Sequence, residues 1–297
     1  MKSHAKVTPE LRHWIVSQIE LGRSPVELIK AMTDKGWPEG TALDIMERTL
    51  RTRVAQLKAK QNQEESASPA PADESLPDPI EVPQPLRDRP NTTFRVLDRE
   101  VRVLARANHP PAILFGGLLS DEECDELVTL ASGRMAPSEV VDMQTGGNKA
   151  HAGRTSSGMY FLRGETPLVE RLERRIEALT AWPYDRGEGL QILHYAVGQE
   201  YQPHFDYVDP AQPGSAPFLA RGGQRVATLI VYLNSPTAGG ATGFPDVGLE
   251  FSAVKGSALF FSYDRAHPST GSRHGGMPVT AGEKWIATKW LRQSTHS

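Results

Sequence analysis

The stretch Tyr201-Gln202-Pro203-His204-Phe205-Asp206-Tyr207 places a histidine and a carboxylate two residues apart. If the stretch is extended, His204 and Asp206 leave the same face of the strand, because successive side chains alternate across a strand. One more histidine would complete a set of two histidines and one carboxylate, which leaves coordination positions open on a non-haem iron. The stretch therefore predicts a strand that carries two ligands of a metal site.

The missing histidine is expected far downstream, in Arg273-His274-Gly275-Gly276. His267 competes for this role, but its neighbours on both sides indicate the tip of a loop. His274 lies in a glycine-flanked turn just before another predicted strand, so the sequence favours His274 as the third ligand. The metal site is thus predicted to consist of His204, Asp206 and His274.

A lysine begins the strand that follows, Lys284-Trp285-Ile286-Ala287-Thr288-Lys289-Trp290. Period-two alternation puts Lys284, Ile286, Thr288 and Trp290 on one face, and Trp285 and Lys289 on the other. If the first face is the inner one, the Lys284 ammonium is buried, which is unfavourable without an anion. Beside three metal ligands, the carboxylate of an anionic cosubstrate is the best account of Lys284.

Composition sets wider limits on the function. The chain has 297 residues, a formal net charge of −3 and 38% hydrophobic residues, so a nucleic-acid partner is not expected. Its single cysteine, Cys124, excludes an intramolecular disulfide framework and fits a reducing compartment. No apolar run is long enough to span a bilayer, and no signal core follows the first residues. We expect a soluble, cytoplasmic protein without membrane contact.

Residues 1–60 are predicted to form a small accessory module of helices. Start signals occur at Thr8-Pro9, at Ser24-Pro25 and at Thr41, each followed by apolar residues at helical spacing. Basic residues near the end of the module permit binding of a partner or of nucleic acid, but a packing module with solvated charges is the favoured interpretation. Residues 61–93 are rich in Pro, Ala, Ser, Asp and Glu and are predicted to be a linker.

Residues 94–297 are predicted to form a larger α+β domain. Ser120 begins one helix, and a second helix is expected over 167–179. Short strands separated by Gly and Pro loops follow, at 190–196, 201–207, 225–234, 258–261 and 285–291. Helices followed by many short strands favour a double-stranded β-helix, or jelly roll, with flanking helices.

Taken together, these motifs resemble the prolyl 4-hydroxylase family of 2-oxoglutarate- and Fe(II)-dependent dioxygenases. The resemblance covers roughly residues 110–292 and leaves residues 1–90 outside it. The family-like segments, in chain order, are 119–124 (LSDEEC), 154–158 (RTSSG), 195–206 (YAVGQEYQPHFD), 224–228 (QRVAT), 239–244 (GGATGF) and 274–290.

The resemblance implies cofactors and a role for each site residue. It implies Fe(II), with 2-oxoglutarate and O2 as cosubstrates and ascorbate as an expected reductant. The metal ligands are His204, Asp206 and His274, and Lys284 pairs with the distal carboxylate of 2-oxoglutarate. Tyr195 and Thr242 are expected to hydrogen-bond to the cosubstrate. The positions that face the substrate in the family correspond to Tyr201, Arg225 and Trp290.

Two departures from the family pattern affect the site. Ala241 stands where the family often has Glu, so a polar contact is expected to be missing there. The loop over residues 209–223 is variable in the family and faces the substrate, so its sequence does not identify what binds.

The implied activity is hydroxylation of an aliphatic C–H bond, with a prolyl residue in a protein or peptide as the first expectation. The same chemistry on a free amino acid such as proline or pipecolate is the alternative. A different class is an oxygenase-like sensor or regulator that binds DNA or a partner protein through the N-terminal helices. Asp206 disfavours a halogenase, where a small residue is expected, and Lys284 disfavours a nucleic-acid demethylase, where arginine is expected.

Overall fold

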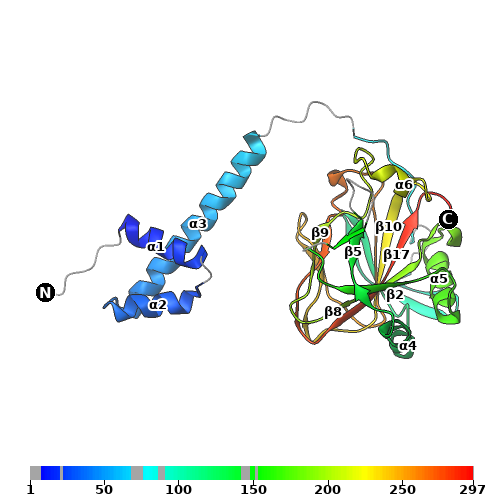
Figure 1. Cartoon of the computed structure of the whole chain (residues 1–297), viewed down its shortest axis with the longest axis horizontal. Helices are drawn as coiled ribbons and strands as arrows, with labels where there is room; N and C mark the ends of the chain where they lie inside the picture. The colour runs from blue at the N-terminus through cyan, green and yellow to red at the C-terminus, as the bar shows by residue number, and fades with distance from the viewer. Residues whose placement is uncertain are drawn as a thin grey trace. The chain divides into compact units, whose positions relative to one another are not determined.

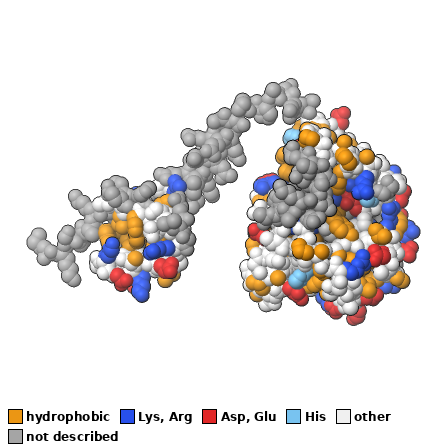
Figure 2. Space-filling view, in the orientation of Figure 1, with side chains coloured by type: hydrophobic (Ala, Val, Ile, Leu, Met, Phe, Trp, Pro, Cys, Tyr) orange, Lys and Arg blue, Asp and Glu red, His pale blue; other side chains and the backbone are white. Residues whose placement is uncertain are grey.

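The computed structural model describes residues 8–20, 23–67, 76–85, 91–141, 148–150 and 153–296. The chain divides into two compact units, Met1–Ser75 and Leu76–Ser297 (Figure 1). On the face shown in Figure 2, acidic and basic side chains are interspersed over both units. Among the described residues, helices that combine the length and the apolar character needed to cross a bilayer are not found.

The first unit contains three helices, α1 (Pro9–Glu20), α2 (Pro25–Asp34) and α3 (Glu39–Ala67). Ser24 and Glu27 form a reciprocal capping box at the start of α2, as their spacing predicts. A small core holds the helices together, through Ile15, Met32, Ala42 and Ile45. Helix α3 begins before the predicted Thr41 and continues past the predicted boundary at residue 60.

The second unit is built on two antiparallel sheets (Figure 1). Among the described residues, the larger sheet has nine strands, in the order β1 (Thr93–Val96), β2 (Arg99–Asn108), β3 (Pro111–Gly116), β14 (Ala258–Ser262), β10 (Arg225–Tyr232), β17 (Lys284–Arg292), β8 (Leu190–Tyr195), β7 (Ser157–Phe161) and β4 (Ala136–Pro137). The smaller sheet has the order β13 (Leu249–Phe251), β12 (Thr242–Phe244), β15 (His274–Gly276) and β9 (Tyr201–His204). The α+β class with a jelly-roll core is therefore confirmed.

Shorter elements complete the second unit. Two-stranded sheets are formed by β11 (Ala238–Gly239) with β16 (Val279–Ala281), and by β5 (Glu139–Val141) with β6 (Asn148–Ala150). A short helix and two 3-10 turns lie in loops, namely α6 (Ser215–Leu219), η1 (Tyr184–Arg186) and η2 (Pro268–Thr270).

Two helices cover one face of the larger sheet, α4 (Asp121–Ser132) and α5 (Pro167–Thr180) (Figure 1). Helix α4 starts at a Ser120–Glu123 capping box, as predicted. The buried faces of both helices join the sheet in one core layer, which includes Cys124. Burial raises the pKa of the Cys124 thiol to about 12, so this residue serves packing, as expected.

A second core layer lies between the larger and the smaller sheet. It is formed by aromatic and aliphatic side chains such as Tyr195, Ile230, Phe244, Phe261 and Ile286. Because strand side chains alternate, each central strand of the larger sheet supplies one face to the helix layer and the other to this inner layer. Residues that face inward from β8, β10 and β17 therefore meet residues from β9, β12 and β15.

The structure contains more strands than were predicted, and two further differences concern the site and the domain boundary. Strand β2 was not predicted, although exposed residues such as Arg102 and Arg106 alternate along it with the less exposed Val101, Val103 and Ala105. Strand β9 ends at His204 rather than at Tyr207. The end of the predicted linker belongs to the second unit, where Ile80 donates its N–H to the Asp264 carbonyl at 2.7 Å.

Candidate active site

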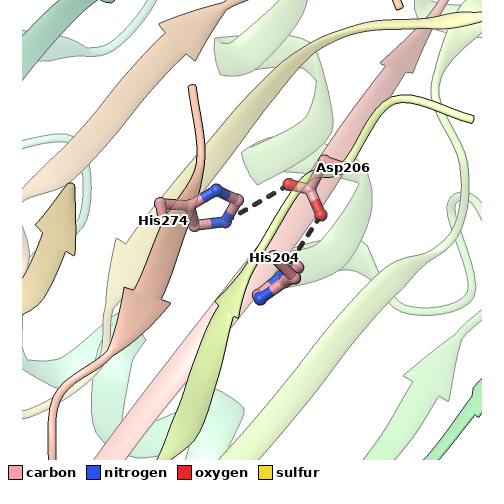
Figure 3. Close-up of side chains that lie close together, drawn as sticks. All are labelled: His204, Asp206 and His274. Carbon is pink, nitrogen blue, oxygen red and sulfur yellow. Dashed lines mark ion pairs between the residues drawn. The ribbon is translucent and has the colours of Figure 1, made fainter. Parts of the chain in front are cut away.

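Three side chains from separate positions converge between the two sheets. His204 ends β9, His274 begins β15, and Asp206 lies in the bend just after β9 (Figure 3). The two histidines are directly paired across the β9–β15 ladder. Asp206 Oδ1 lies 3.6 Å from His204 Nε2, and Asp206 Oδ2 lies 3.5 Å from His274 Nε2. One ligand atom from each residue fits within a span of 4.8 Å.

The extended-strand argument for His204 and Asp206 needs a correction. The strand stops at His204, so the two side chains do not meet by alternation along one strand. A bend brings the Asp206 carboxylate back toward the histidines, where Thr228 of β10 donates a hydrogen bond to it at 2.6 Å. The predicted trio is therefore brought together, but by a turn and not by strand geometry.

Hydrogen bonds orient both imidazole rings. The Nδ1 atom of His204 lies 2.9 Å from the Gln202 carbonyl oxygen, and the Nδ1 atom of His274 lies 3.0 Å from the Ser272 carbonyl oxygen. A carbonyl oxygen only accepts, so each Nδ1 carries the proton and each Nε2 presents a lone pair to the shared centre. Backbone partners of this kind are typical of metal-binding histidines.

The surroundings of the cluster favour a neutral His274 and an ionised Asp206, the protonation states in which these residues bind a metal. Burial lowers the pKa of His274 to about 4, so this imidazole is neutral at neutral pH. Burial alone would raise the pKa of Asp206, but His274 and His204 outweigh it, and the carboxyl stays ionised. Two imidazoles and one carboxylate are the donor set that suits a non-haem Fe(II) and leaves positions open. The residues present therefore fit Fe(II).

Lys284 lies in the same cavity and is 1% exposed. Among the described residues, no carboxylate forms an ion pair with it, and its Nζ atom lies 5.5 Å and 5.9 Å from the ring centres of Tyr195 and Tyr232. Burial lowers its pKa to about 8. A buried ammonium without a carboxylate beside it is unfavourable until an anion enters. The cavity therefore fits a dicarboxylate such as 2-oxoglutarate, held at one end by Lys284.

The other predicted cosubstrate contacts also line this cavity. The Tyr195 side chain comes from β8 and is paired across the ladder with Lys284. Thr242 comes from β12, and its Oγ1 atom accepts a hydrogen bond from the Tyr232 hydroxyl at 2.8 Å. Strand β17 alternates as predicted, because Lys284, Ile286, Thr288 and Trp290 all line the cavity.

Of the three predicted substrate-facing residues, two line the cavity. The Tyr201 ring stacks on the His204 ring at 3.7 Å, and Trp290 forms another part of the wall. Arg225 does not line the cavity. Its guanidinium forms a two-point ion pair with Glu188, at 2.6 Å and 2.9 Å, and covers the Trp290 ring at 4.0 Å. Arg225 thus supports Trp290 instead of forming part of the cavity wall, because the buried Glu188 carboxylate holds it there.

Several polar residues at the cavity were given no role from the sequence, although Arg154 and Thr228 lie in the family-like segments. Thr228, Gln191 and Arg154 line the cavity, and Tyr263 lies behind Thr228. A signal existed for two of them, because Gln191 and Thr228 are polar residues with apolar neighbours on both sides in their strands. The competing histidine, His267, does not belong to the described cluster of metal-ligand atoms. It begins η2, and its ring accepts a hydrogen bond from the Ser269 N–H.

Comparison with known proteins gives consistent matches over this unit. Residues 190–292 match the family model described as 2OG-Fe(II) oxygenase superfamily. The chain is 41% identical over 204 residues to prolyl 4-hydroxylase 5 of Arabidopsis thaliana, which covers 61% of this chain and 68% of that protein. It is 40% identical over 204 residues to probable prolyl 4-hydroxylase 3 of the same plant, covering 61% and 69%.

Solved structures of similar proteins include the viral collagen prolyl hydroxylase of Paramecium bursaria Chlorella virus-1, in complex with 2-oxoglutarate. That structure is 28% identical, covers 61% of this chain and 95% of its own, and superposes with a TM-score of 0.47.

Proposed function

This chain belongs to the prolyl 4-hydroxylase family of 2-oxoglutarate- and Fe(II)-dependent oxygenases, and we propose that its substrate is a prolyl residue within a peptide chain. The observation that carries the proposal is the 41% identity to prolyl 4-hydroxylase 5. The proposed metal ligands are His204, Asp206 and His274, and Lys284, Tyr195 and Thr242 are the proposed contacts of 2-oxoglutarate.

When bound, Fe(II) supplies the redox chemistry that couples decarboxylation of 2-oxoglutarate to insertion of one oxygen atom of O2 into a C–H bond. The protein's own residues position the reactants. The imidazoles of His204 and His274 and the Asp206 carboxylate would hold the metal from one side, and the Lys284 ammonium would hold the far carboxylate of the cosubstrate. Aromatic and aliphatic walls, including Phe244, Phe261 and Ile286, exclude water from this centre.

The wall formed by Trp290 and Tyr201 is the proposed contact of the prolyl ring. Trp290 is 7% exposed, and within the described part of the chain its indole N–H has no acceptor. A carbonyl or carboxylate oxygen of the substrate would accept this hydrogen bond, so Trp290 is a proposed polar contact as well as an apolar wall. Arg225 and Glu188 act one step further away by holding the Trp290 ring in place.

The proposal is tested by incubating the protein with Fe(II), 2-oxoglutarate and ascorbate and with proline-containing peptides, free proline or free pipecolate. Succinate and the mass of each candidate product are measured. We expect succinate to form with a peptide whose prolyl residue gains one oxygen atom. Oxygen gain by a free amino acid alone would contradict the peptide assignment and leave the oxygenase chemistry standing. An Asp206→Ala variant is the control for metal-dependent turnover.

A further inference from the structure

The two oxygens of the Asp206 carboxylate have different surroundings. Thr228 Oγ1 lies 2.6 Å from Oδ2, and an ionised carboxylate only accepts, so the threonine hydroxyl donates. The recorded neighbour of Oδ1 is another metal-ligand atom, His204 Nε2, at 3.6 Å. Both residues are buried, Thr228 at 0% and Asp206 at 6% exposed. The threonine therefore occupies one oxygen and leaves the other available.

A tyrosine extends this contact away from the metal centre. The Tyr263 hydroxyl, on a side chain that is 2% exposed, lies 2.9 Å from Thr228 Oγ1. Because the single hydroxyl proton of Thr228 is used on Asp206, Tyr263 must be the donor in this second bond. Both hydrogen bonds therefore run in one direction: Tyr263 donates to Thr228, and Thr228 donates to Asp206. Strands β10 and β14, which carry or precede these residues, are paired side by side.

The position of Thr228 is unusual for its strand. Its neighbours on β10 are Val, Ala, Leu and Ile residues, all buried. A hydroxyl in such a strand is unfavourable unless it is hydrogen-bonded, and valine has nearly the same shape. Packing alone would therefore favour valine at this position. The hydroxyl is explained by the bond that it makes to Asp206.

We propose that Thr228 and Tyr263 form a positioning relay that holds Asp206 as a one-oxygen metal ligand. By fixing Oδ2, the relay sets the rotation of the carboxylate and reserves Oδ1 for the metal. Removing a group that orients a metal ligand in this way typically weakens metal affinity by a factor of about 10–100. The proposal concerns metal binding, so it stands whichever substrate is hydroxylated.

The test is a titration of the metal-free protein with Mn(II) or Co(II) in the absence of substrate. Metal binding is measured by calorimetry and by the absorption spectrum of the bound metal. Thr228→Val is expected to raise the metal Kd by roughly 10–100-fold. Thr228→Ser, which keeps the hydroxyl, is expected to restore most of the affinity. Tyr263→Phe should have a smaller effect. Adding it to Thr228→Val should weaken binding no further, because the relay passes through Thr228.

Thr180→Val is the matched control, since Thr180 is also a buried threonine, 1% exposed, whose hydroxyl bonds to the Ile176 carbonyl within α5. It should leave the metal Kd unchanged. Wild-type affinity in Thr228→Val would overturn the proposal, and so would a Thr228→Ser variant as weak as the valine variant. If Thr228→Val does not fold, the metal Kd of Thr228→Ser and of Tyr263→Phe is measured instead. An unchanged metal Kd in Tyr263→Phe would then contradict the proposed relay.

Discussion

Lys284 is the single residue whose surroundings most clearly require a ligand. It is almost fully buried, and its nearest recorded partners are two tyrosine rings. Lys284→Ala is therefore expected to raise the apparent KM for 2-oxoglutarate by at least about tenfold, since a buried charge pair is typically worth more than about 1.4 kcal/mol. Lys255→Ala, which removes a surface lysine paired with Asp125, is the control and should leave this KM unchanged. An unaltered KM in the Lys284 variant would remove that residue from the cosubstrate site.

The pH dependence of 2-oxoglutarate binding follows from the same residue. Burial lowers the pKa of Lys284 to about 8, and only the protonated form attracts a carboxylate. Binding should be strongest below this pKa, and the Kd should rise by up to about tenfold per pH unit above it. Tyr195 and Tyr232 face the ammonium, but burial raises the pKa of both hydroxyls, so they stay neutral in this window.

Calorimetric titration of the Mn(II)-loaded protein with 2-oxoglutarate at several pH values measures this dependence. Lys284→Ala is the control and should show weak binding with a flatter profile. A steep rise of Kd above pH about 8 that persists in the alanine variant would assign the dependence to another group.

At the residue scale, the sequence predicted the groups that carry unusual chemistry for their position. His204, Asp206, His274 and Lys284 all meet in one cavity. Arg225 was assigned to the substrate by resemblance, and nothing in the sequence reveals its ion pair with Glu188, which lies on a distant segment. Thr228 and Tyr263 were missed because a threonine and a tyrosine are ordinary in strands, and their role depends on what lies across the sheet.

At the scale of elements, the alternation of β17 was predictable because it depends on period two alone. The convergence of His204 with Asp206 was predicted from the wrong geometry, since β9 ends before Asp206. Strand ends are set by which neighbouring strand remains to pair, here β15, which a local pattern does not contain. The β9–β15 pair is thus the element on which the metal site depends.

Two adjacent glycines in β15 test this dependence. A Cβ atom on Gly275 would lie 2.7 Å from the Tyr201 carbonyl oxygen and 3.1 Å from the Pro203 nitrogen, both in the β9 backbone. Gly275→Ala should therefore push β9 and β15 apart and weaken metal binding by at least about tenfold, a loss comparable to that of an orienting group. Titration of the metal-free protein with Mn(II) measures the effect.

Gly276→Ala is the matched variant, because its Cβ atom would meet nothing closer than Lys284 Nζ at 3.7 Å, an ordinary contact. It should bind metal as the wild type does. Equal metal affinity in the two variants would show that close approach of the two strands is not what sets the ligand geometry.

At the scale of the whole molecule, the two units divide at Ser75 and Leu76. The sequence predicted a helical module, a linker and an oxygenase domain, but placed the start of the last at residue 94. Residues 76–85 pack on the second unit, with Ile80 and Val82 against its core and Pro83 and Pro85 buried. A proline-rich composition indicates missing regular structure, and it does not reveal whether the segment lies on a folded surface.

Two truncations distinguish these boundaries. Deleting residues 1–75 should leave the Tm of the oxygenase unit and its turnover unchanged, because the second unit has its own core. Deleting residues 1–85 should lower the stability of that unit by about 2–4 kcal/mol, since the apolar side chains of Ile80 and Val82 lose their partners. Thermal unfolding of both proteins provides the measurement. Equal Tm values would show that residues 76–85 add nothing to the fold.

The central claim is that this cavity hydroxylates a prolyl residue with one atom of dioxygen, using the metal held by His204, Asp206 and His274. The most direct measurement is the isotope content of a proline-containing peptide and of succinate after turnover under oxygen-18-labelled dioxygen. The account predicts one labelled oxygen in the hydroxyprolyl residue and one in succinate, and neither product with Asp206→Ala. An unlabelled hydroxyl group on the peptide, or labelled product from the Asp206 variant, would contradict it.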